Sequence, residues 1–266
     1  MERIIIEKTL DGLGTVAYAD YLAHAYCTAG SCRFVFNGKP FILQAGNLMI
    51  VRRGMLVEQI IPSTDFQVQV IYVTADFISL STPQSNYGTR GCLSLFLNPI
   101  MHLTPEQQAL CAQDFEQVAF RLRERGHHFY QNMLIATIQM LILDFFDFHS
   151  HLYPEEIVSD ANASIMGRFI LMLEEGQFRQ HREVAYYADC LCVTPKYLSE
   201  VSKKVSGYGA NYWIHRYTIL DISRLLRDHS LSFTEIAHRT GFSSPAYFSR
   251  YVQQHLGVNP SDYRGG

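Results

Sequence analysis

The last third of the chain contains one local pattern twice, and this repeat constrains the fold more than any other feature. Each copy begins with a short helical segment that carries a small residue, Ala188 or Ala237, and continues through a tight turn. A Thr-Pro or Ser-Pro pair then opens a second helix, because the missing N–H of proline has no helical partner at the first position anyway. A small residue lets two helices pack closely, and the turn carries the second helix across the first. The repeat therefore predicts two helix-turn-helix units.

The apolar positions of both copies support this interpretation. The second helix of the first copy turns Leu198 and Val201 inward, and that of the second copy turns Phe248 and Val252 inward. A helix over residues 211–227 joins the copies and would hold both second helices on one face, as two adjacent major grooves of DNA require. Helices are expected over residues 164–175, 183–189, 195–205, 210–228, 234–240 and 245–256.

The charge of the chain is unevenly distributed. The 266 residues carry a formal net charge of −3, and their number favours two domains. The first 159 residues hold 10 Lys and Arg against 15 Asp and Glu, whereas residues 160–266 hold 12 against 10. DNA affinity depends on the charge of the docking face rather than on the net charge. An acidic chain can therefore still end in a DNA-binding domain.

The first part of the chain reads as many short strands. Residues 4–74 are short apolar and aromatic runs separated by Gly, Pro, Asn and Ser. Residues 33–36 lead into Asn37-Gly38, a pair that adopts the left-handed dihedrals of a tight hairpin. Repeated short antiparallel strands close most easily as a β-barrel or jelly roll. The predicted fold class is therefore α+β, with an N-terminal barrel that has trailing helices and an all-α C-terminal domain.

Two helices and a linker are expected between these parts. Thr104 caps a helix that runs to about residue 125, and a second helix covers residues 129–148. The apolar stripe of this second helix is so wide that it must be covered on two sides. The cover is expected either from the barrel together with a symmetry partner, or entirely from the helix's own chain. The expected division is a sensor and dimerisation domain over residues 1–150, a linker over 151–163 and the DNA-binding domain over 164–266.

No membrane segment is expected. The apolar run over residues 133–148 is interrupted by polar residues, and the N-terminus lacks the pattern of a signal peptide. The predicted location is the cytoplasm, without a membrane partner.

Three stretches of the last third, IAHRTGF, YFSRYVQQHLG and NPSDYR, closely resemble the signature of the AraC/XylS family of transcriptional regulators. The stretch CVTPKYLSEVSKKVSG is similar to the first helix-turn-helix of that family. The resemblance covers residues 165–264, and it extends weakly to a cupin-like sensor barrel in the first half. It implies a sequence-specific regulator that binds double-stranded DNA as a homodimer. RNA polymerase and a small effector are further candidate partners.

The resemblance also implies which residues meet DNA, through recognition helices over residues 195–204 and 245–254. Base edges are expected to be read by Lys196, Ser199, Glu200, Ala246, Tyr247 and Arg250. Phosphates are expected to be held by Lys203, Lys204, Thr194 and Ser244. Lys196 and Arg250 can donate to guanine, and Glu200 can accept from cytosine.

The N-terminal barrel could enclose one small ligand. Aromatic and polar walls for it are offered by Tyr18, Tyr21, His24, Tyr26, Phe34 and Phe36, although core filling is the more common role for each such residue taken singly. No metal site is expected, because the strand region has only His24, with Glu58 distant in sequence. The chain is accordingly predicted to have no cofactor and no enzymatic activity.

Three alternatives remain open. The six cysteines lack C-x-x-C spacing and read as reduced, mostly buried thiols, but Cys190 and Cys192 lie in a predicted turn and could serve a DNA-modifying protein. The N-terminal domain could be purely structural in a ligand-independent regulator. The helical domain could be a pure interaction module.

Overall fold

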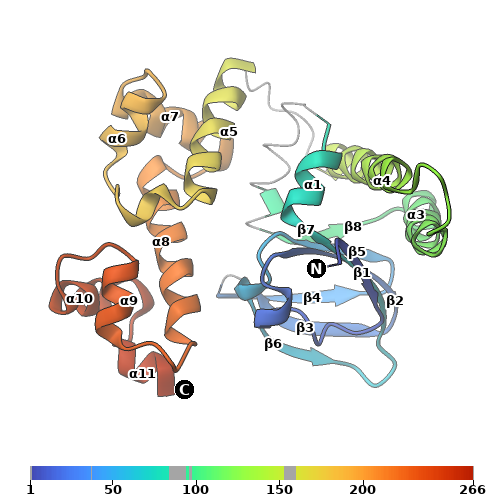
Figure 1. Ribbon diagram of the computed structural model, residues 1–266, viewed down its shortest axis with the longest axis horizontal. Helices are drawn as coiled ribbons and strands as arrows, with labels where there is room; N and C mark the ends of the chain where they lie inside the picture. Colours follow the sequence, from blue (N-terminus) through green and yellow to red (C-terminus); the bar gives the residue numbers. More distant parts are fainter. Residues whose placement is uncertain (1, 37, 84–93, 96–97, 153–159, 266) are drawn as a thin grey trace. The chain divides into compact units, whose positions relative to one another are not determined.

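The computed structural model describes residues 2–36, 38–83, 94–95, 98–152 and 160–265. The chain divides into two compact units, an N-terminal unit (Met1–Ile157) and a C-terminal unit (Val158–Gly266), whose elements are labelled in Figure 1. The predicted linker is helical at both ends: α4 continues to Leu152 and α5 begins at Asp160. Residues 153–159 of that linker lie outside the described residues.

The N-terminal unit contains two antiparallel sheets. The five-stranded sheet has the order β1-β7-β2-β5-β8, and the three-stranded sheet has the order β4-β3-β6. The strands are β1 (Ile4–Glu7), β2 (Tyr21–Ala29), β3 (Ser31–Phe36), β4 (Lys39–Gln44), β5 (Asn47–Val51), β6 (Val57–Pro62), β7 (Gln67–Thr74) and β8 (Ile100–His102). Short 3-10 helices are η1 (Val16–Tyr18) and η2 (Gly54–Leu56). The predicted hairpin is confirmed: Phe36 pairs with Lys39, and Gly38 has a φ of +73°. Asn37 lies outside the described residues.

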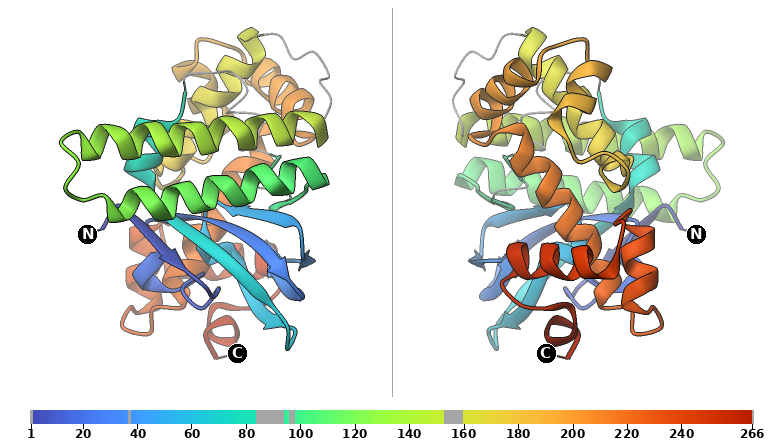
Figure 2. Two further views of the ribbon diagram at one scale, coloured as in Figure 1. Left: turned by 90° about the vertical axis from the view of Figure 1, so that its right-hand side faces the viewer. Right: turned by 90° about the vertical axis from the view of Figure 1, so that its left-hand side faces the viewer.

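The helices of this unit whose bounds lie within the described residues are α1 (Ala75–Ser81), α3 (Pro105–Arg123) and α4 (Tyr130–Leu152). Figure 2 shows α3 and α4 side by side across the five-stranded sheet. Thr104 caps α3 as expected, in a capping box with Gln107. The sequence did not predict α1 or β8, because seven and three residues are too few to display a periodicity.

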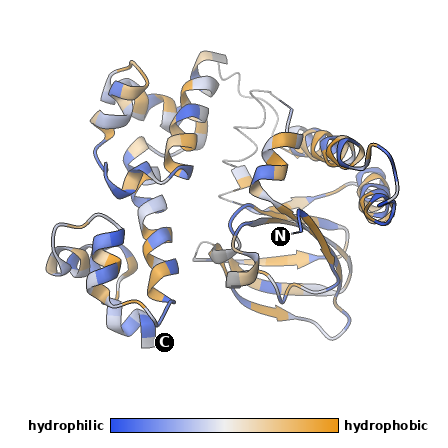
Figure 3. Cartoon of the chain, in the orientation of Figure 1, coloured by the Kyte–Doolittle hydropathy of each residue, from blue (hydrophilic) through white to orange (hydrophobic). Residues whose placement is uncertain are grey.

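Strand β2 is buried on both faces, and the alternation of its side chains separates two layers of core. His24 and Tyr26 face the helices, where their rings lie 5.8 Å from that of Phe145 and 5.9 Å from that of Phe115. Ala25 and Cys27 point to the opposite face and are fully buried. Figure 3 shows that hydrophobic residues occupy much of the strands, whereas the connection between α3 and α4 is hydrophilic.

Helix α4 is long and apolar enough to cross a membrane by length and composition, with a mean hydropathy of 1.3 over its most apolar window. This finding corrects the expectation that no segment is long and apolar enough to span a membrane. Core helices of soluble proteins meet the same criterion, and Ile138, Leu141 and Phe145 of α4 are buried in the N-terminal unit. Packing on the sheet thus accounts for the buried side of α4.

The regular elements that the described residues of the C-terminal unit form are all helices. Its elements are α5 (Asp160–Glu174), η3 (Gln177–Arg179), α6 (Val184–Cys190), α7 (Pro195–Ser206), α8 (Ala210–Leu226), α9 (Phe233–Arg239), α10 (Pro245–Leu256) and α11 (Pro260–Gly265). The six helices expected from the sequence are confirmed within a few residues at each end. α11 was not predicted, although the motif NPSDYR covers most of it.

Two carboxyl groups lie between α3 and α4 of the N-terminal unit. Asp114 of α3 is 9% exposed. Burial, together with the nearby carboxylate of Asp144, raises the pKa of Asp114 to about 7. The unfolded chain should bind this proton only below the ordinary value of about 3.9. Between about pH 4 and pH 7, the folded protein therefore holds a proton on Asp114 that the unfolded chain has released.

We expect Asp114 to make the N-terminal unit less stable as pH rises from about 4 to about 7, because the folded-state pKa is raised. Asp114→Asn should remove this fall and increase the free energy of unfolding at pH 8 by about 1–2 kcal/mol, after allowance for solvent screening. Urea unfolding at pH 5 and pH 8 measures both effects. The control is Glu116→Gln, an exposed residue of the same helix. Equal pH dependence in Asp114→Asn and wild type would contradict this assignment.

Candidate nucleic-acid interface and apolar cavity

Helices α6–α7 and α9–α10 form two helix-turn-helix units, which we name the first and the second helix-turn-helix. The small residues Ala188 and Ala237 are 0% and 2% exposed, as close helix packing requires. The predicted inward residues Leu198, Val201, Phe248 and Val252 are all buried. The repeat read from the sequence is thus confirmed at the level of packing.

The two turns also share one backbone path. The amide of Val193 donates to the carbonyl of Ala188 at 2.9 Å, and that of Phe242 donates to Ala237 at 2.8 Å. Cys192 and Gly241 occupy corresponding positions in the left-handed region, with φ of +57° and +71°. The sequence pattern did not indicate that a cysteine would take this conformation.

Caps position the start of both recognition helices. The hydroxyl of Thr194 accepts from the amide of Tyr197 at 3.1 Å, and that of Ser244 accepts from Tyr247 at 3.2 Å. These two hydroxyls fix the first turn of α7 and of α10, where side chains that enter a major groove must project.

The residues expected to read bases lie on the solvent side of these helices. The side chain of Lys196, in the first turn of α7, is 86% exposed. Arg250 is exposed one turn further along α10, at the position that corresponds to Glu200. Glu200, Ala246 and Tyr247 are also exposed, and Ser199 is half-buried. Their contacts with DNA stay a prediction.

The ammonium Nζ of Lys196 lies 3.9 Å from Oε1 of Glu200, one helical turn later. Such an exposed pair is worth little, so DNA could break it at small cost. The expected phosphate contacts Lys203 and Lys204 are exposed near the end of α7.

Tyr197 was missed by the sequence reasoning. It is 42% exposed and lies three residues after its cap, as Tyr247 does after Ser244. Its hydroxyl donates to Oδ1 of Asn162 at 3.0 Å. The equal spacing from the two caps was the signal that could have identified it.

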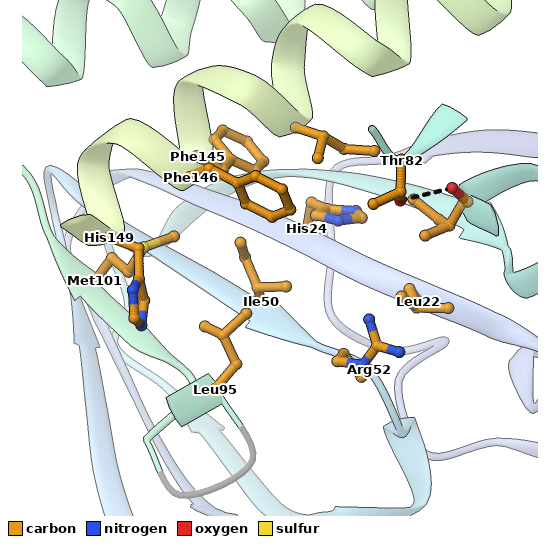
Figure 4. A pocket seen from close by; sticks show the side chains of 12 residues that line it. Leu22, His24, Ile50, Arg52, Thr82, Leu95, Met101, Phe145, Phe146 and His149 are labelled. Carbon is orange, nitrogen blue, oxygen red and sulfur yellow. Dashed lines mark hydrogen bonds between the residues drawn. The ribbon is translucent and has the colours of Figure 1, made fainter. Parts of the chain in front are cut away.

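An apolar cavity of about 60 Å³ lies between α4, α1 and the five-stranded sheet of the N-terminal unit. It is lined by Leu22, His24, Ile50, Arg52, Ile78, Thr82, Leu95, Met101, Ile142, Phe145, Phe146 and His149. Figure 4 shows the polar side chains of His149 and Arg52 on opposite sides of the apolar lining. The cavity has room for a few water molecules only, so a larger ligand would have to displace side chains of α4.

Of the six residues expected to line a pocket, His24 lies in this cavity. Its Nδ1 is 3.4 Å from the carbonyl oxygen of Ile71, and burial lowers the pKa of His24 to about 4, so the ring is neutral at pH 7.

The other five lie elsewhere. Tyr18 and Tyr21 cluster with Tyr72, with centroids 4.4 Å and 6.5 Å from its ring. Tyr26 packs on Phe115 further along β2. Phe34 and Phe36 are buried on β3 of the other sheet. Strand alternation decides these placements, and the sequence did not show which face of each strand meets the helices.

Comparison with known proteins connects both units to one family. A model described as AraC-like ligand binding domain matches residues 18–131, and a model described as helix-turn-helix domain matches residues 187–266. The two matches together cover more than two thirds of the chain.

The chain belongs to the AraC family of transcriptional regulators.

This AraC-family chain is similar to the thermoregulatory protein LcrF of Yersinia pestis, with 25% identity over 88% of this chain and 86% of LcrF. It is 35% identical to the regulatory protein PocR of Salmonella typhimurium over 27% of this chain, a stretch that spans only 24% of PocR. A crystal structure of ToxT from Vibrio cholerae with bound unsaturated fatty acid superposes with a TM-score of 0.49 and 16% identity, over 98% of this chain and 93% of ToxT.

Among the described residues of this AraC-family chain, no three His, Cys, Asp or Glu side chains gather in a metal-binding group. Cys27, Cys32 and Cys111 are buried free thiols, whereas Cys190 and Cys192 are exposed at the turn of the first helix-turn-helix. Cys92 lies outside the described residues. The alternative of a reactive cysteine in the turn stays an untested prediction.

Proposed function

We propose that this chain is a cytoplasmic transcriptional regulator that binds double-stranded DNA through α7 and α10. The observation that carries the proposal is the repeated turn, which leads in both copies into a capped helix with an exposed cation, Lys196 or Arg250. Helices of this kind read base edges from the major groove, and their N-termini and nearby lysines hold phosphates. Binding alone accounts for this function, so we propose no catalytic step.

Footprinting of the purified full chain on genomic fragments tests the proposal and returns the target site. Two protected major grooves about one helical turn apart are the expected result. Affinity should fall steeply with salt, because lysine and arginine contacts release counterions. If no fragment is protected at about 50–100 mM salt, DNA binding is contradicted, because low salt strengthens even weak contacts with phosphate.

The cavity between α4 and the sheet is the proposed effector site. Its lining is apolar with a few polar groups, among them His24, Thr82 and Arg52, which suits a small apolar molecule that carries a hydrogen-bonding or acidic group. An effector larger than the cavity must move α4, and this movement is the proposed signal to the rest of the protein. RNA polymerase is a candidate recipient of that signal.

Calorimetric titration of the full chain with a panel of small apolar acids and alcohols tests the effector site. The expected result is one binding class that also changes DNA affinity. Absence of binding across the panel, together with unchanged promoter response after removal of the N-terminal unit, would leave the alternative of a purely structural N-terminal unit.

Dimerisation through α4 is the further proposal. Met140 and Leu143 lie one turn apart on α4 and are 63% and 48% exposed. Met140→Glu with Leu143→Glu is expected to convert a dimer to a monomer in analytical ultracentrifugation, because two charges cannot be buried without partners. Gln139→Glu, an exposed neighbour, should leave the dimer intact. A wild-type monomer at micromolar concentration would contradict the dimer.

A further inference from the structure

A short segment before α6 touches the second helix-turn-helix, although it leads into the first. The guanidinium of Arg182 donates to the carbonyl oxygen of Thr240, and its Nη1 donates to that of Gly241 at 3.4 Å. Its Cζ also lies 4.0 Å from the centroid of the Phe242 ring. Three consecutive residues of one turn are therefore held by one side chain that lies more than 55 residues earlier in the chain.

The backbone of this segment also lies close to the turn of the second helix-turn-helix. A Cβ atom added to Gly241 would lie 1.8 Å from the carbonyl oxygen of Arg179. The left-handed turn alone does not demand a glycine, because Cys192 takes the same conformation in the first helix-turn-helix. The glycine is therefore required by the close approach of the segment around Arg179 rather than by the turn.

Arg179 ties this segment to the helix that joins the two units. Its Nε and Nη2 donate to the two carboxylate oxygens of Asp221 on α8 at 2.6 Å and 3.0 Å. The side chain of Asp221 is 8% exposed, and its hydrogen bond raises the pKa of Arg179. A two-pronged bond to a buried carboxylate fixes direction as well as distance.

The shape of the Arg182 side chain suits it to these contacts. It is half-buried among carbonyl oxygens and aromatic rings, with the Tyr251 ring 6.0 Å from its Cζ. A planar guanidinium can stack on Phe242 and donate sideways to two carbonyls at once, which a lysine ammonium cannot do.

These contacts give the two helix-turn-helix units a second connection besides α8. Helix α8 alone would let the two helix-turn-helix units bend and twist relative to each other, whereas a second connection restrains both motions. We infer that Arg179, Arg182 and Gly241 form a joint that fixes the separation and angle of α7 and α10, so that the protein accepts only one spacing between its two DNA half-sites. The inference rests on the proposed DNA-binding function.

The test compares the full-length wild type with Arg182→Gln on the footprinted site and on versions with one or two base pairs inserted between the half-sites. Each inserted pair rotates one half-site by about 35°. Wild type should lose about tenfold or more in affinity per insertion, because simultaneous engagement fails. Arg182→Gln should lose less than about threefold per insertion, with unchanged affinity for an isolated half-site.

Arg224→Gln is the matched control. The Nη2 of Arg224 donates to the same carboxylate of Asp221 at 3.1 Å, but both residues belong to α8, so its loss leaves the joint closed. This variant should keep the spacing dependence of the wild type. If the wild type binds no fragment, the proposed function is wrong. If the wild type binds but Arg182→Gln shows the same spacing dependence, the joint alone is wrong.

A second measurement needs no DNA. Spin labels at Lys204→Cys and Gln254→Cys, in a full chain with Cys92, Cys190 and Cys192 replaced by serine, report the distance between corresponding positions of α7 and α10. A narrow distribution is expected with Arg182 present, and a broader one with Arg182→Gln or Gly241→Ala. Equal widths in the three proteins would overturn the joint even if a variant had lost stability.

Discussion

Trp213→Ala is expected to lower the free energy of unfolding of the C-terminal unit by about 3–5 kcal/mol and to abolish DNA binding at 37 °C. Trp213 is fully buried in the first turn of α8, and its ring meets that of Tyr212 edge-on at 5.3 Å. Its Nε1 donates at 2.8 Å to the hydroxyl of Ser206, the last residue of α7. The indole therefore joins the end of the first recognition helix to the central helix.

Urea unfolding followed by circular dichroism measures the effect. Trp213 is the only tryptophan of the chain, so the tryptophan fluorescence of the wild type, excited selectively over tyrosine, reports the C-terminal unit. Trp213→Phe should lose about 1–2 kcal/mol, since most of the ring stays and the bond to Ser206 is lost. A loss below about 1 kcal/mol for the alanine variant would show that this site collapses around the missing ring.

Lys196→Ala and Arg250→Ala are each expected to weaken specific DNA binding about 5- to 150-fold, in line with roughly 1–3 kcal/mol per base contact. If α7 and α10 bind together, the double variant should lose the product of the two factors. Binding to random DNA should change much less, because phosphate contacts dominate it. Fluorescence anisotropy on the footprinted site and on scrambled DNA measures both.

Lys203→Ala provides the contrast. It is exposed near the end of α7, where a phosphate contact is expected, so its loss should weaken specific and random DNA alike and make the salt dependence shallower by about one contact. If Lys196→Ala and Arg250→Ala behaved in this same uniform way, both side chains would be phosphate ligands, and base reading by these residues would be wrong.

The sequence predicted best where the signals were local. Caps, prolines and apolar spacing act within a few residues, so the helices of the C-terminal unit and the hairpin after Phe36 followed from them directly. For the predicted barrel, the described residues form eight strands in two antiparallel sheets, and the likeness to a cupin stays a prediction. Short elements such as α1 and β8 carried too few residues for a pattern.

The pocket shows why the remaining site residues could not be predicted. Tyr26 and His24 share one face of β2, yet only His24 lines the cavity, because the position of α4 over the sheet decides which part stays open. Arg52 and His149 come from segments about a hundred residues apart. No periodicity in the sequence links two such residues.

The sequence by itself determined that this chain has two helix-turn-helix units, each with a capped recognition helix and an outward cation. It could do so because helix starts, turns and buried stripes are written in neighbouring residues. Only the tertiary structure decided where the cavity lies and that Arg182 reaches the turn of the second helix-turn-helix. These features depend on contacts between residues far apart in the chain, and packing of whole elements brings those residues together.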